Sequence, residues 1–294
     1  MANIIVLGGS GFIGKSLIDR LEKTNSTNTT VMVHSTKIKT SLKKFQGNIL
    51  DKTLKKNIQD GDVIVNLVGQ YNGEISNFIN LNINGSFNLI ESCKGKKNIK
   101  IILISSIDVY GECGKQSSRE NKKLSPQYSY GLIKLFNEKI YENFAKTNNV
   151  NIIVLRLGNL YGPNKKNGLI LNLLKSIKKK KLVSINQNGR QQRDYLFIDD
   201  AVDGILQAIN SKLKKYNTFN ISSGKCYRST QIIKLIQDIS NKKLNLKINN
   251  ETQDEKCICA DISKAQRLLK FSPKVSIKQG LAMTIKDLAN NTKK

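Results

Sequence analysis

A glycine-rich turn at residues 8–14 constrains the fold of this chain more than any other feature. An apolar, β-branched run at residues 3–7 precedes it, which predicts a strand buried on both faces. Apolar residues at helical spacing follow it. A strand, spaced glycines and a helix in this order are typical of a dinucleotide-binding unit. We expect Gly8 to make the tight turn, Gly11 to let the backbone approach a pyrophosphate, and Gly14 to let the helix pack on the strand.

The start of the predicted helix would complete this phosphate site. Backbone N–H groups of its first turn, including those of Phe12 and Ile13, would point toward the pyrophosphate, and the positive end of the helix dipole would favour it. The spacing is G-x-x-G-x-x-G, one residue different from the G-x-G-x-x-G form. An ordinary strand-to-helix turn is the alternative interpretation.

The residues after the second predicted strand, 30–33, bear on which dinucleotide is bound. An acidic residue here would grip the adenosine ribose of NAD, but residues 34–39 contain no carboxylate. Hydroxyl groups and a lysine would instead accept a 2′-phosphate. The sequence therefore favours NADP over NAD, with Ser35, Thr36 and Lys37 as candidate contacts. Lys37 could equally be a solvated surface residue.

Strand-like and helix-like segments alternate along the first half of the chain. This alternation predicts an α/β fold with a doubly wound (Rossmann) parallel sheet and a smaller C-terminal substrate-binding lobe. We expect residues 1–163 to form the NAD(P)-binding domain, with residues 195–224 returning to it and 164–294 forming mainly the lobe. The further strands and helices are expected at residues 62–68, 83–93, 100–105, 130–144 and 151–156.

The chain is strongly basic, with a formal net charge of +27 from 49 Lys+Arg and 22 Asp+Glu. Such a charge invites a nucleic-acid interpretation. However, only seven of the 49 basic residues are arginine, the lysines are spread along the whole chain, and no recognition motif accompanies them. We expect no specific nucleic-acid partner. No window approaches the ~18 apolar residues of a membrane span, so we expect no membrane partner either.

Five cysteines lie at positions 93, 113, 226, 257 and 259, without the paired spacing of zinc sites. Cys257 and Cys259 are too close for a Cys-x-x-Cys pair, although alternation in a strand would point both the same way. An odd number of cysteines, with no signal-peptide pattern at the start, indicates reduced thiols in a cytoplasmic protein. With His34 as the only histidine, we expect no metal site and no histidine-based triad.

Tyr130 and Lys134 lie four residues apart on a predicted helix, so they share one face of it. An ammonium beside a phenol favours the phenolate and lowers its pKa from about 10. Tyr130 could then take a proton from a sugar hydroxyl while hydride leaves the same carbon. The predicted strand before this helix ends at Ser105 and Ser106, which delivers hydroxyls to the sheet edge where ligands collect. Such a pair alone also arises by chance on many helices.

These motifs, in this order, resemble the extended short-chain dehydrogenase/reductases, the NAD-dependent epimerase/dehydratase family that modifies nucleotide sugars. The resemblance covers nearly the whole chain. It rests on the segments at residues 8–14, 82–86, 105–111, 130–134, 156–163, 193–200, 220–224 and 261–265.

The resemblance implies roles for individual residues. Ser106, Tyr130 and Lys134 match the family's catalytic Ser/Thr-Tyr-Lys positions, with Ser106 also holding the substrate oxygen and Tyr130 and Lys134 also contacting the cofactor. The family's other cofactor contacts match five further residues. Asn48 and Ile49 would lie near adenine, where aspartate is commoner in the family than this asparagine. Leu67 and Val68 would line the cofactor, and Asn82 would lie near the nicotinamide.

Two further positions match residues that hold the nucleotide diphosphate of the substrate, Asn159 and Arg193. The rigid fork of an arginine suits that task because it grips phosphate at two points. An ion pair of Arg193 with Asp194, Asp199 or Asp200 is the alternative. The resemblance also suggests a homodimer built from the helix that carries Tyr130 and the one near residues 83–93.

The reaction depends on acids beside the serine. Dehydratases of the family carry an Asp-Glu pair there, whereas this chain has Ile107 and Asp108, which argues against elimination of water. We interpret the chain as an NAD(P)-dependent nucleotide-sugar epimerase that removes and returns a hydride at sugar C4. An NADPH-dependent 4-keto-sugar reductase is the alternative, favoured by the missing ribose-binding acid. A non-catalytic NADP sensor or scaffold is an alternative from another class, although such proteins usually lose the tyrosine or lysine.

Overall fold

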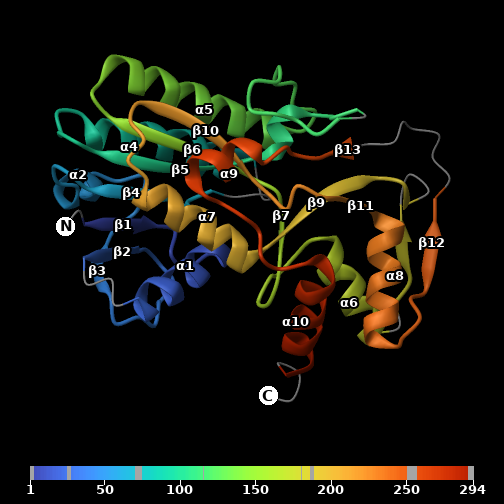
Figure 1. Ribbon diagram of the computed structural model, residues 1–294. Helices are drawn as coiled ribbons and strands as arrows, with labels where there is room; N and C mark the ends of the chain where they lie inside the picture. Colours follow the sequence, from blue (N-terminus) through green and yellow to red (C-terminus); the bar gives the residue numbers. More distant parts are fainter. Residues whose placement is uncertain are drawn as a thin grey trace. The chain divides into compact units, whose positions relative to one another are not determined.

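The fold is organised around a sheet in which strand β1 (Ile4–Leu7) lies between β2 and β4 (Figure 1). The computed structural model describes residues 3–24, 28–69, 75–114, 116–179, 181–185, 189–249 and 257–290. Within these residues the sheet has seven strands in the order β10-β6-β5-β4-β1-β2-β3. Its other strands are β2 (Thr29–Val33), β3 (Lys43–Gln46), β4 (Val63–Asn66), β5 (Lys100–Ser106), β6 (Asn151–Leu157) and β10 (Tyr216–Ile221).

The order of strands reverses at β1. The chain adds β2 and β3 on one side of β1, then crosses over to add β4, β5 and β6 on the other, and the pairs from β3 through to β5 are parallel. The prediction of a doubly wound sheet is confirmed. In such sheets ligands bind beyond the carboxyl ends of the strands, at the point of reversal. Here that point lies between the ends of β1 and β4.

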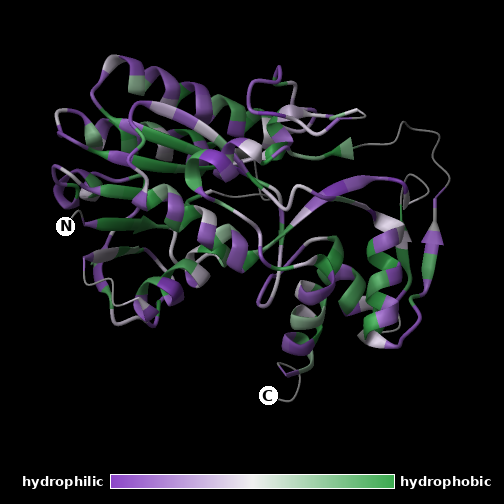
Figure 2. Ribbon diagram, in the orientation of Figure 1, coloured by the Kyte–Doolittle hydropathy of each residue, from purple (hydrophilic) through white to green (hydrophobic). Residues whose placement is uncertain are grey.

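Both faces of the sheet are buried because apolar residues occupy consecutive positions in its strands. Ile5 and Leu7 face one side and Val6 the other, and all three are at most 1% exposed. The face of Ile5 packs against α2 (Thr53–Asn57), α4 (Gly85–Cys93) and α5 (Ser129–Thr147). Helices α1 (Phe12–Lys23) and α7 (Ile198–Asn210) lie on the opposite side (Figure 1) and are joined by an ion pair between Arg20 and Asp203. Figure 2 shows the apolar strands between helices whose outer faces are polar.

The chain divides into two units. Unit 1 comprises residues 1–109, 124–156 and 202–219, and unit 2 comprises residues 110–123, 157–201 and 220–294. Unit 1 holds most of the large sheet, together with α3 (Ile75–Ile79), a π-helical turn (Asn80–Asn84) that leads into α4, and most of a 3₁₀ turn (Ile107–Tyr110) that follows β5.

Unit 2 contains two small sheets. In one, β9 pairs with β7, β11 and β13, and in the other β8 pairs with β12. None of the helices in the described part of the chain is long and apolar enough to cross a membrane. The elements of unit 2 are β7 (Asn159–Tyr161), α6 (Leu169–Lys179), β8 (Val183–Ile185), β9 (Gln192–Phe197), β11 (Cys226–Arg228), α8 (Ser229–Ser240), β12 (Leu246–Ile248), β13 (Cys257–Ile258), α9 (Ser263–Leu269) and α10 (Ile277–Asn290).

Candidate active site

The glycine turn lies at the point where the strand order reverses. Gly8 follows β1 with φ +83°, a conformation that side chains rarely adopt. A Cβ on Gly8 would lie 2.9 Å from the carbonyl carbon of Leu67 and from the amide nitrogen of Val68, at the end of β4. A Cβ on Gly14 would overlap the carbonyl oxygen of Gly8 and lie 2.6 Å from Cα of Gly9. Glycine at positions 8 and 14 is therefore required by close backbone packing.

The start of α1 presents a surface suited to an anion. Gly11 caps the helix in an extended conformation and makes no side-chain cap hydrogen bond, and the first turn, which begins with Phe12 and Ile13, holds no acidic residue. A Cβ on Gly11 would meet only the carbonyl oxygen of Gly8, at 3.3 Å. Because no side chain covers the backbone at Gly11, and the N-terminal end of the helix dipole is positive, these residues fit a pyrophosphate.

The end of β4 connects this turn to the catalytic candidates. Leu67 and Val68 are half-buried. Just beyond them, a Cβ on Gly69 would lie 2.9 Å from Oδ1 of Asn82 and 3.3 Å from Nζ of Lys134. Asn82 is buried, and its Nδ2 donates to the carbonyl oxygen of Phe78. The predicted cofactor residues that follow β4, and Asn82 of the π-helical turn, thus lie beside the predicted catalytic lysine.

The candidate adenosine contacts lie at the ends of β2 and β3. Ser35, Thr36 and Lys37 are exposed. Nδ2 of Asn48 lies 3.3 Å from Nε2 of His34, which joins the ends of the two strands. Ile49 is only 2% exposed and belongs to the core cluster. Its carbonyl oxygen accepts from Nδ2 of Asn88 at 2.7 Å, so Ile49 is held in the core beside this site.

Lys134 is buried in the middle of α5. Its side chain donates from Nζ to the carbonyl oxygen of Ile104 at 3.0 Å and is 6% exposed. Nζ lies 5.6 Å from the centroid of the Tyr130 ring. Burial lowers the pKa of Lys134 to about 8, against the opposing effect of the Glu138 carboxylate. An ammonium with this pKa still carries its proton at neutral pH.

Ser106, at the end of β5, and Asp108 are joined by two hydrogen bonds. The Ser106 hydroxyl donates to Oδ2 of Asp108 at 3.0 Å and accepts from the backbone N–H of Asp108 at 3.1 Å. A Cβ on Gly131 would lie 2.7 Å from the carbonyl oxygen of Asp108. This close approach brings the start of α5, with Tyr130, against the turn that carries Asp108. Unit 1 therefore places Ser106, Tyr130 and Lys134 around one sheet edge.

A hydrogen-bonded network that the sequence did not predict holds α5 in place. Glu138, one turn beyond Lys134, accepts from Arg156 of β6, with Nη2 at 2.6 Å from Oε2, and from the hydroxyl of Ser105 at 2.5 Å. The side chains of Arg156 and Glu138 are only 5% and 2% exposed. An arginine in an otherwise apolar strand, and a glutamate one turn after Lys134, were the signals available in the sequence.

The two candidate substrate residues lie in unit 2. Nδ2 of Asn159, in β7, donates to the carbonyl oxygen of Asp194 at 3.4 Å. Arg193, in β9, is half-buried and donates to the carbonyl oxygen of its neighbour Gln192. Among the described residues no ion pair joins Arg193 to Asp194 or to the other two candidate acids. Instead, the buried Asp194 accepts from the backbone N–H groups of residues 223 and 224.

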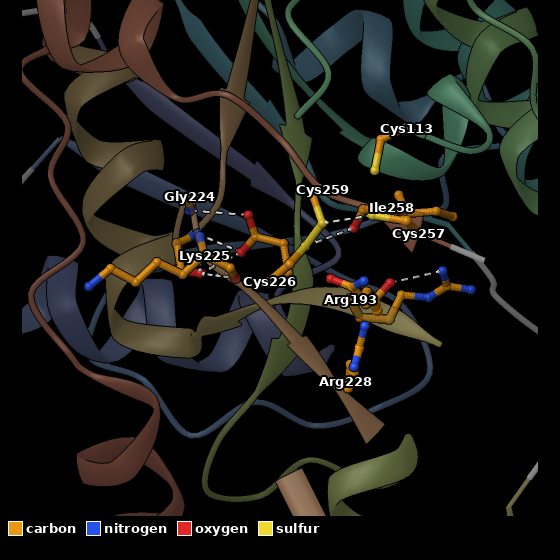
Figure 3. Close-up of a disulfide and its surroundings, with 12 residues drawn as sticks. Cys113, Arg193, Gly224, Lys225, Cys226, Arg228, Cys257, Ile258 and Cys259 are labelled. Atoms are coloured by element: carbon orange, nitrogen blue, oxygen red, sulfur yellow. Dashed lines mark hydrogen bonds between the residues drawn. A yellow bond between two sulfur atoms is a disulfide. The ribbon is translucent and has the colours of Figure 1, made fainter. Parts of the chain in front are cut away.

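The prediction about the cysteines is wrong in one respect. Cys226 and Cys259 form a disulfide, so the thiols are not all reduced (Figure 3). The absence of a metal site stays a prediction, although the fold brings the sulfur atoms of Cys113, Cys257 and Cys259 within 4.8 Å of one another. Spacing along the chain did not indicate this cluster, because Cys113 is far from the other two cysteines in sequence. Cys257 and Cys259 do point the same way, with their Sγ atoms 3.3 Å apart.

Known proteins are similar to this chain, in sequence or in fold, over nearly its whole length. An uncharacterised UDP-glucose epimerase of Bacillus subtilis is 29% identical and aligns over 98% of each chain. The crystal structure of UDP-glucuronic acid 4-epimerase from Bacillus cereus, in complex with UDP-glucuronic acid and NAD, matches with a TM-score of 0.89 at 27% identity, covering 98% of this chain and 99% of that one. UDP-glucose 4-epimerase from Thermotoga maritima, with UDP-glucose, matches with a TM-score of 0.86 at 27% identity over 99% of each chain.

The family itself follows from a match over most of the sequence. Residues 4–222 fit the model of the NAD dependent epimerase/dehydratase family. This span includes the glycine turn, the catalytic candidates of α5 and both substrate candidates. The chain therefore belongs to the NAD dependent epimerase/dehydratase family.

Proposed function

We propose that the protein is an NAD(P)-dependent nucleotide-sugar 4-epimerase, which removes a hydride from C4 of the sugar and returns it to the opposite face. The observation that carries this proposal is the placement of Tyr130 and the buried Lys134 on α5, in the same unit as the Gly8 turn. The 4-epimerases of Bacillus cereus and Thermotoga maritima, both similar along their full length, support this choice among the reactions of the family.

Tyr130 is the proposed acid and base. When bound, the nicotinamide cofactor would accept the hydride from C4 and give it back. Tyr130 would take the proton of the C4 hydroxyl as hydride leaves, and return it to the sugar oxygen after the ring has turned over. Lys134 would support this role, because a buried ammonium 5.6 Å from the ring favours the phenolate.

Ser106 would hold the sugar oxygen. Its hydroxyl donates to Asp108 in the structure, so the proton would turn from Asp108 to the substrate on binding. Asp108 would then be left as an acceptor behind the serine. Ile107, where dehydratases of the family carry an acid, is 1% exposed and apolar, which favours epimerisation over elimination of water.

We further propose that NADP binds more tightly than NAD. Ser35, Thr36 and Lys37 are exposed after β2, without a carboxylate that would repel a 2′-phosphate. Dissociation constants for the two coenzymes test this directly. Tighter binding of NADP is expected, and tighter binding of NAD, the cofactor in the Bacillus cereus complex, would contradict the preference without affecting the proposed reaction.

For the substrate, Asn159 and Arg193 are the proposed ligands of the nucleotide diphosphate. No ion pair with a described residue occupies the Arg193 guanidinium, and its fork matches two phosphate oxygens. The Arg193→Met variant should raise KM for the nucleotide sugar with a smaller effect on kcat. An unchanged KM would remove Arg193 from this role.

A homodimer is proposed through α4 and α5. Large apolar side chains on these helices face solvent, with Phe87 46% exposed, Leu132 54% and Phe136 46%. Burying them against a second copy would remove this surface from water. Sedimentation should show a dimer that the Phe136→Lys variant dissociates, and a monomeric wild-type protein would contradict the assembly.

The reaction is tested by mixing purified protein with UDP-glucose, UDP-GlcNAc and dTDP-sugars and looking for C4 epimers without added cofactor. Epimer formation without net consumption of coenzyme is expected. Stoichiometric NADPH consumption with a 4-keto sugar, and no epimer, would instead make the protein a ketoreductase.

A further inference from the structure

Three segments of unit 2 bring four cysteines together: three sulfur atoms form a close group, and the fourth is bonded to one of them (Figure 3). Cys226 begins β11, Cys257 begins β13, Cys259 follows β13, and Cys113 comes from the loop after the 3₁₀ turn. The sulfur atoms of Cys113, Cys257 and Cys259 lie within 4.8 Å of one another, and that of Cys226 is bonded to Cys259. The proposed epimerase reaction uses none of these groups.

Backbone pairing, as well as the disulfide, places the sulfur atoms. The N–H of Cys113 donates to the carbonyl oxygen of Cys257 at 2.7 Å, and the N–H of Ser118 donates to that of Cys259 at 2.8 Å. The N–H of Asp261 in turn donates to the carbonyl oxygen of Ser118 at 3.0 Å. Because these contacts are between main-chain atoms, the loop that carries Cys113 stays beside residues 257–261 when the disulfide is open.

Two cations lie close enough to act on the cluster. The pKa of the Cys257 thiol is raised by its hydrogen bond to Cys113 and by burial, whereas the charges of Arg193 and Lys122 oppose that rise. Lys122 is fixed by hydrogen bonds from Nζ to the carbonyl oxygen of Glu112 at 2.6 Å and to Oγ of Ser118 at 3.2 Å. Positive charge is therefore available to offset the negative charge of clustered thiolates.

We propose that, once the Cys226–Cys259 disulfide is reduced, the four cysteines bind one Zn²⁺ as a closed tetrathiolate site. Tetrahedral zinc with Zn–S bonds of about 2.3 Å places its sulfur ligands about 3.8 Å apart. The 3.3 Å between the sulfurs of Cys257 and Cys259, and the 4.8 Å limit for these two and Cys113, lie on either side of that distance. The Cys226 sulfur lies outside this group of three, and once released from Cys259 it would turn toward the metal as the fourth ligand. Soft thiolate ligands select zinc over magnesium or calcium, and a site with four protein ligands leaves no position for a reacting water.

The chemistry balances with a dithiol as the reductant. The dithiol gives two electrons and two protons to the Cys226–Cys259 bond and becomes a disulfide itself. Four protein thiols then lose four protons as Zn²⁺ binds, which leaves a site of net charge −2. The disulfide and the zinc site exclude each other, because both require the sulfurs of Cys226 and Cys259.

The site would link two of the strands that pair with the strand carrying Arg193. Cys226 of β11 lies opposite Asp194 of β9, and Cys257 of β13 lies opposite Gln192 of the same strand. A metal shared by the two segments would therefore fix β9 between them. Zinc would serve to order this sheet, and no catalytic step is assigned to it.

Zinc content tests the proposal on the full-length chain without a histidine tag. The protein is reduced with a dithiol, loaded with Zn²⁺ without air, and separated from free metal by gel filtration. One zinc per chain is expected, and X-ray absorption should show four sulfur neighbours at about 2.3 Å. Less than one zinc per chain, or a shell that contains nitrogen and oxygen ligands, would overturn the proposal. Binding of iron in place of zinc, seen as an iron chromophore, would also overturn it.

A matched pair of variants assigns the ligands. Cys257→Ala should weaken zinc binding, measured by competition with a chelator, by more than the roughly 10–100-fold that loss of an outer-shell partner costs. Cys93→Ala, which changes a buried cysteine of unit 1, should leave the affinity unchanged. Equal affinities in the two variants would contradict the site. The X-ray absorption of the wild type decides the question if Cys257→Ala does not fold.

Discussion

Tyr130 and Lys134 lie one helical turn apart but in different environments. Lys134 is 6% exposed, whereas Tyr130 is half-buried and can meet a ligand. Because the Lys134 ammonium is shielded from water, its electric field is weakly screened at the Tyr130 ring, 5.6 Å away. The sequence predicted the pair, since a spacing of four residues places both on one face. It could not predict that the lysine would be buried, which depends on the strand below it.

Replacement of the phenol separates chemistry from binding. Tyr130→Phe should lower kcat by about 10²–10⁴-fold, because it removes the group that transfers the proton. The dissociation constant for the coenzyme should stay near the wild-type value, since the ring remains. Tyr128→Phe, at an exposed position two residues earlier, is the control and should retain activity. Full activity of Tyr130→Phe would exclude this tyrosine as the acid and base.

The buried ammonium makes stability depend on pH. Burial lowers the pKa of Lys134 to about 8, while an unfolded lysine titrates at about 10. Between these values the unfolded chain binds more protons, so this residue makes the free energy of unfolding rise with pH from about 8 to about 10. Below that window the folded protein bears the full cost of the charge.

Lys134→Met tests this effect in the absence of coenzyme. Urea unfolding at pH 7 should show a gain on the order of 1 kcal/mol, and the rise between about pH 8 and 10 should be smaller than in the wild type. Activity should be lost. Lys139→Met, an exposed lysine of the same helix, should keep the wild-type slope. Identical slopes in Lys134→Met and the wild type would show that the ammonium is not buried.

At the scale of elements, α5 carries Tyr130, Lys134 and Glu138 at intervals of four residues, on one face. The last of these fixes the helix to β5 and β6 through Ser105 and Arg156. The element that presents the catalytic pair is thus anchored by a buried ion pair directly below it. Geometry at the sheet edge depends on this anchor.

Breaking the buried ion pair between Glu138 and Arg156 should lower the free energy of unfolding. Glu138→Gln leaves the charge of Arg156 buried without its partner, and the free energy of unfolding should fall by about 3–5 kcal/mol. Glu142→Gln removes the exposed pairs of α5 with Lys139 and Lys146, and should cost no more than about 1 kcal/mol. Chemical denaturation measures both. A loss for Glu138→Gln as small as that for Glu142→Gln would contradict the role of the ion pair.

The strands differ in how clearly the sequence indicated them. β1, β4, β5 and β6 are buried on both faces and read as continuous apolar runs, which single out such strands. β3, with the sequence KKFQ, lies at the edge of the sheet and is mostly exposed, so it carries no apolar signal. The strands of unit 2 are mostly three residues or fewer, apart from β9, and too short for a periodic pattern.

At the scale of the whole molecule, the order of motifs was enough to predict the doubly wound sheet and the family. It did not predict the contacts between distant segments. The cysteine cluster joins residue 113 to residues 226, 257 and 259, and the buried partners Glu138 and Arg156 lie on separate elements. Such contacts arise from the fold, and no local spacing encodes them. The net charge of +27 remains a property of the surface, to which we assign no specific partner.

Retention of a deuterium label at C4 tests whether one active site both removes and returns the hydride. A UDP-sugar substrate that carries deuterium at C4 is incubated with the protein in ordinary water, and the C4 epimer is analysed by mass spectrometry and NMR. The epimer should keep the deuterium at C4, because hydride leaves and returns within one active site without contact with solvent. Loss of the label to water, or accumulation of a 4-keto sugar with deuterated coenzyme and no epimer, would contradict it.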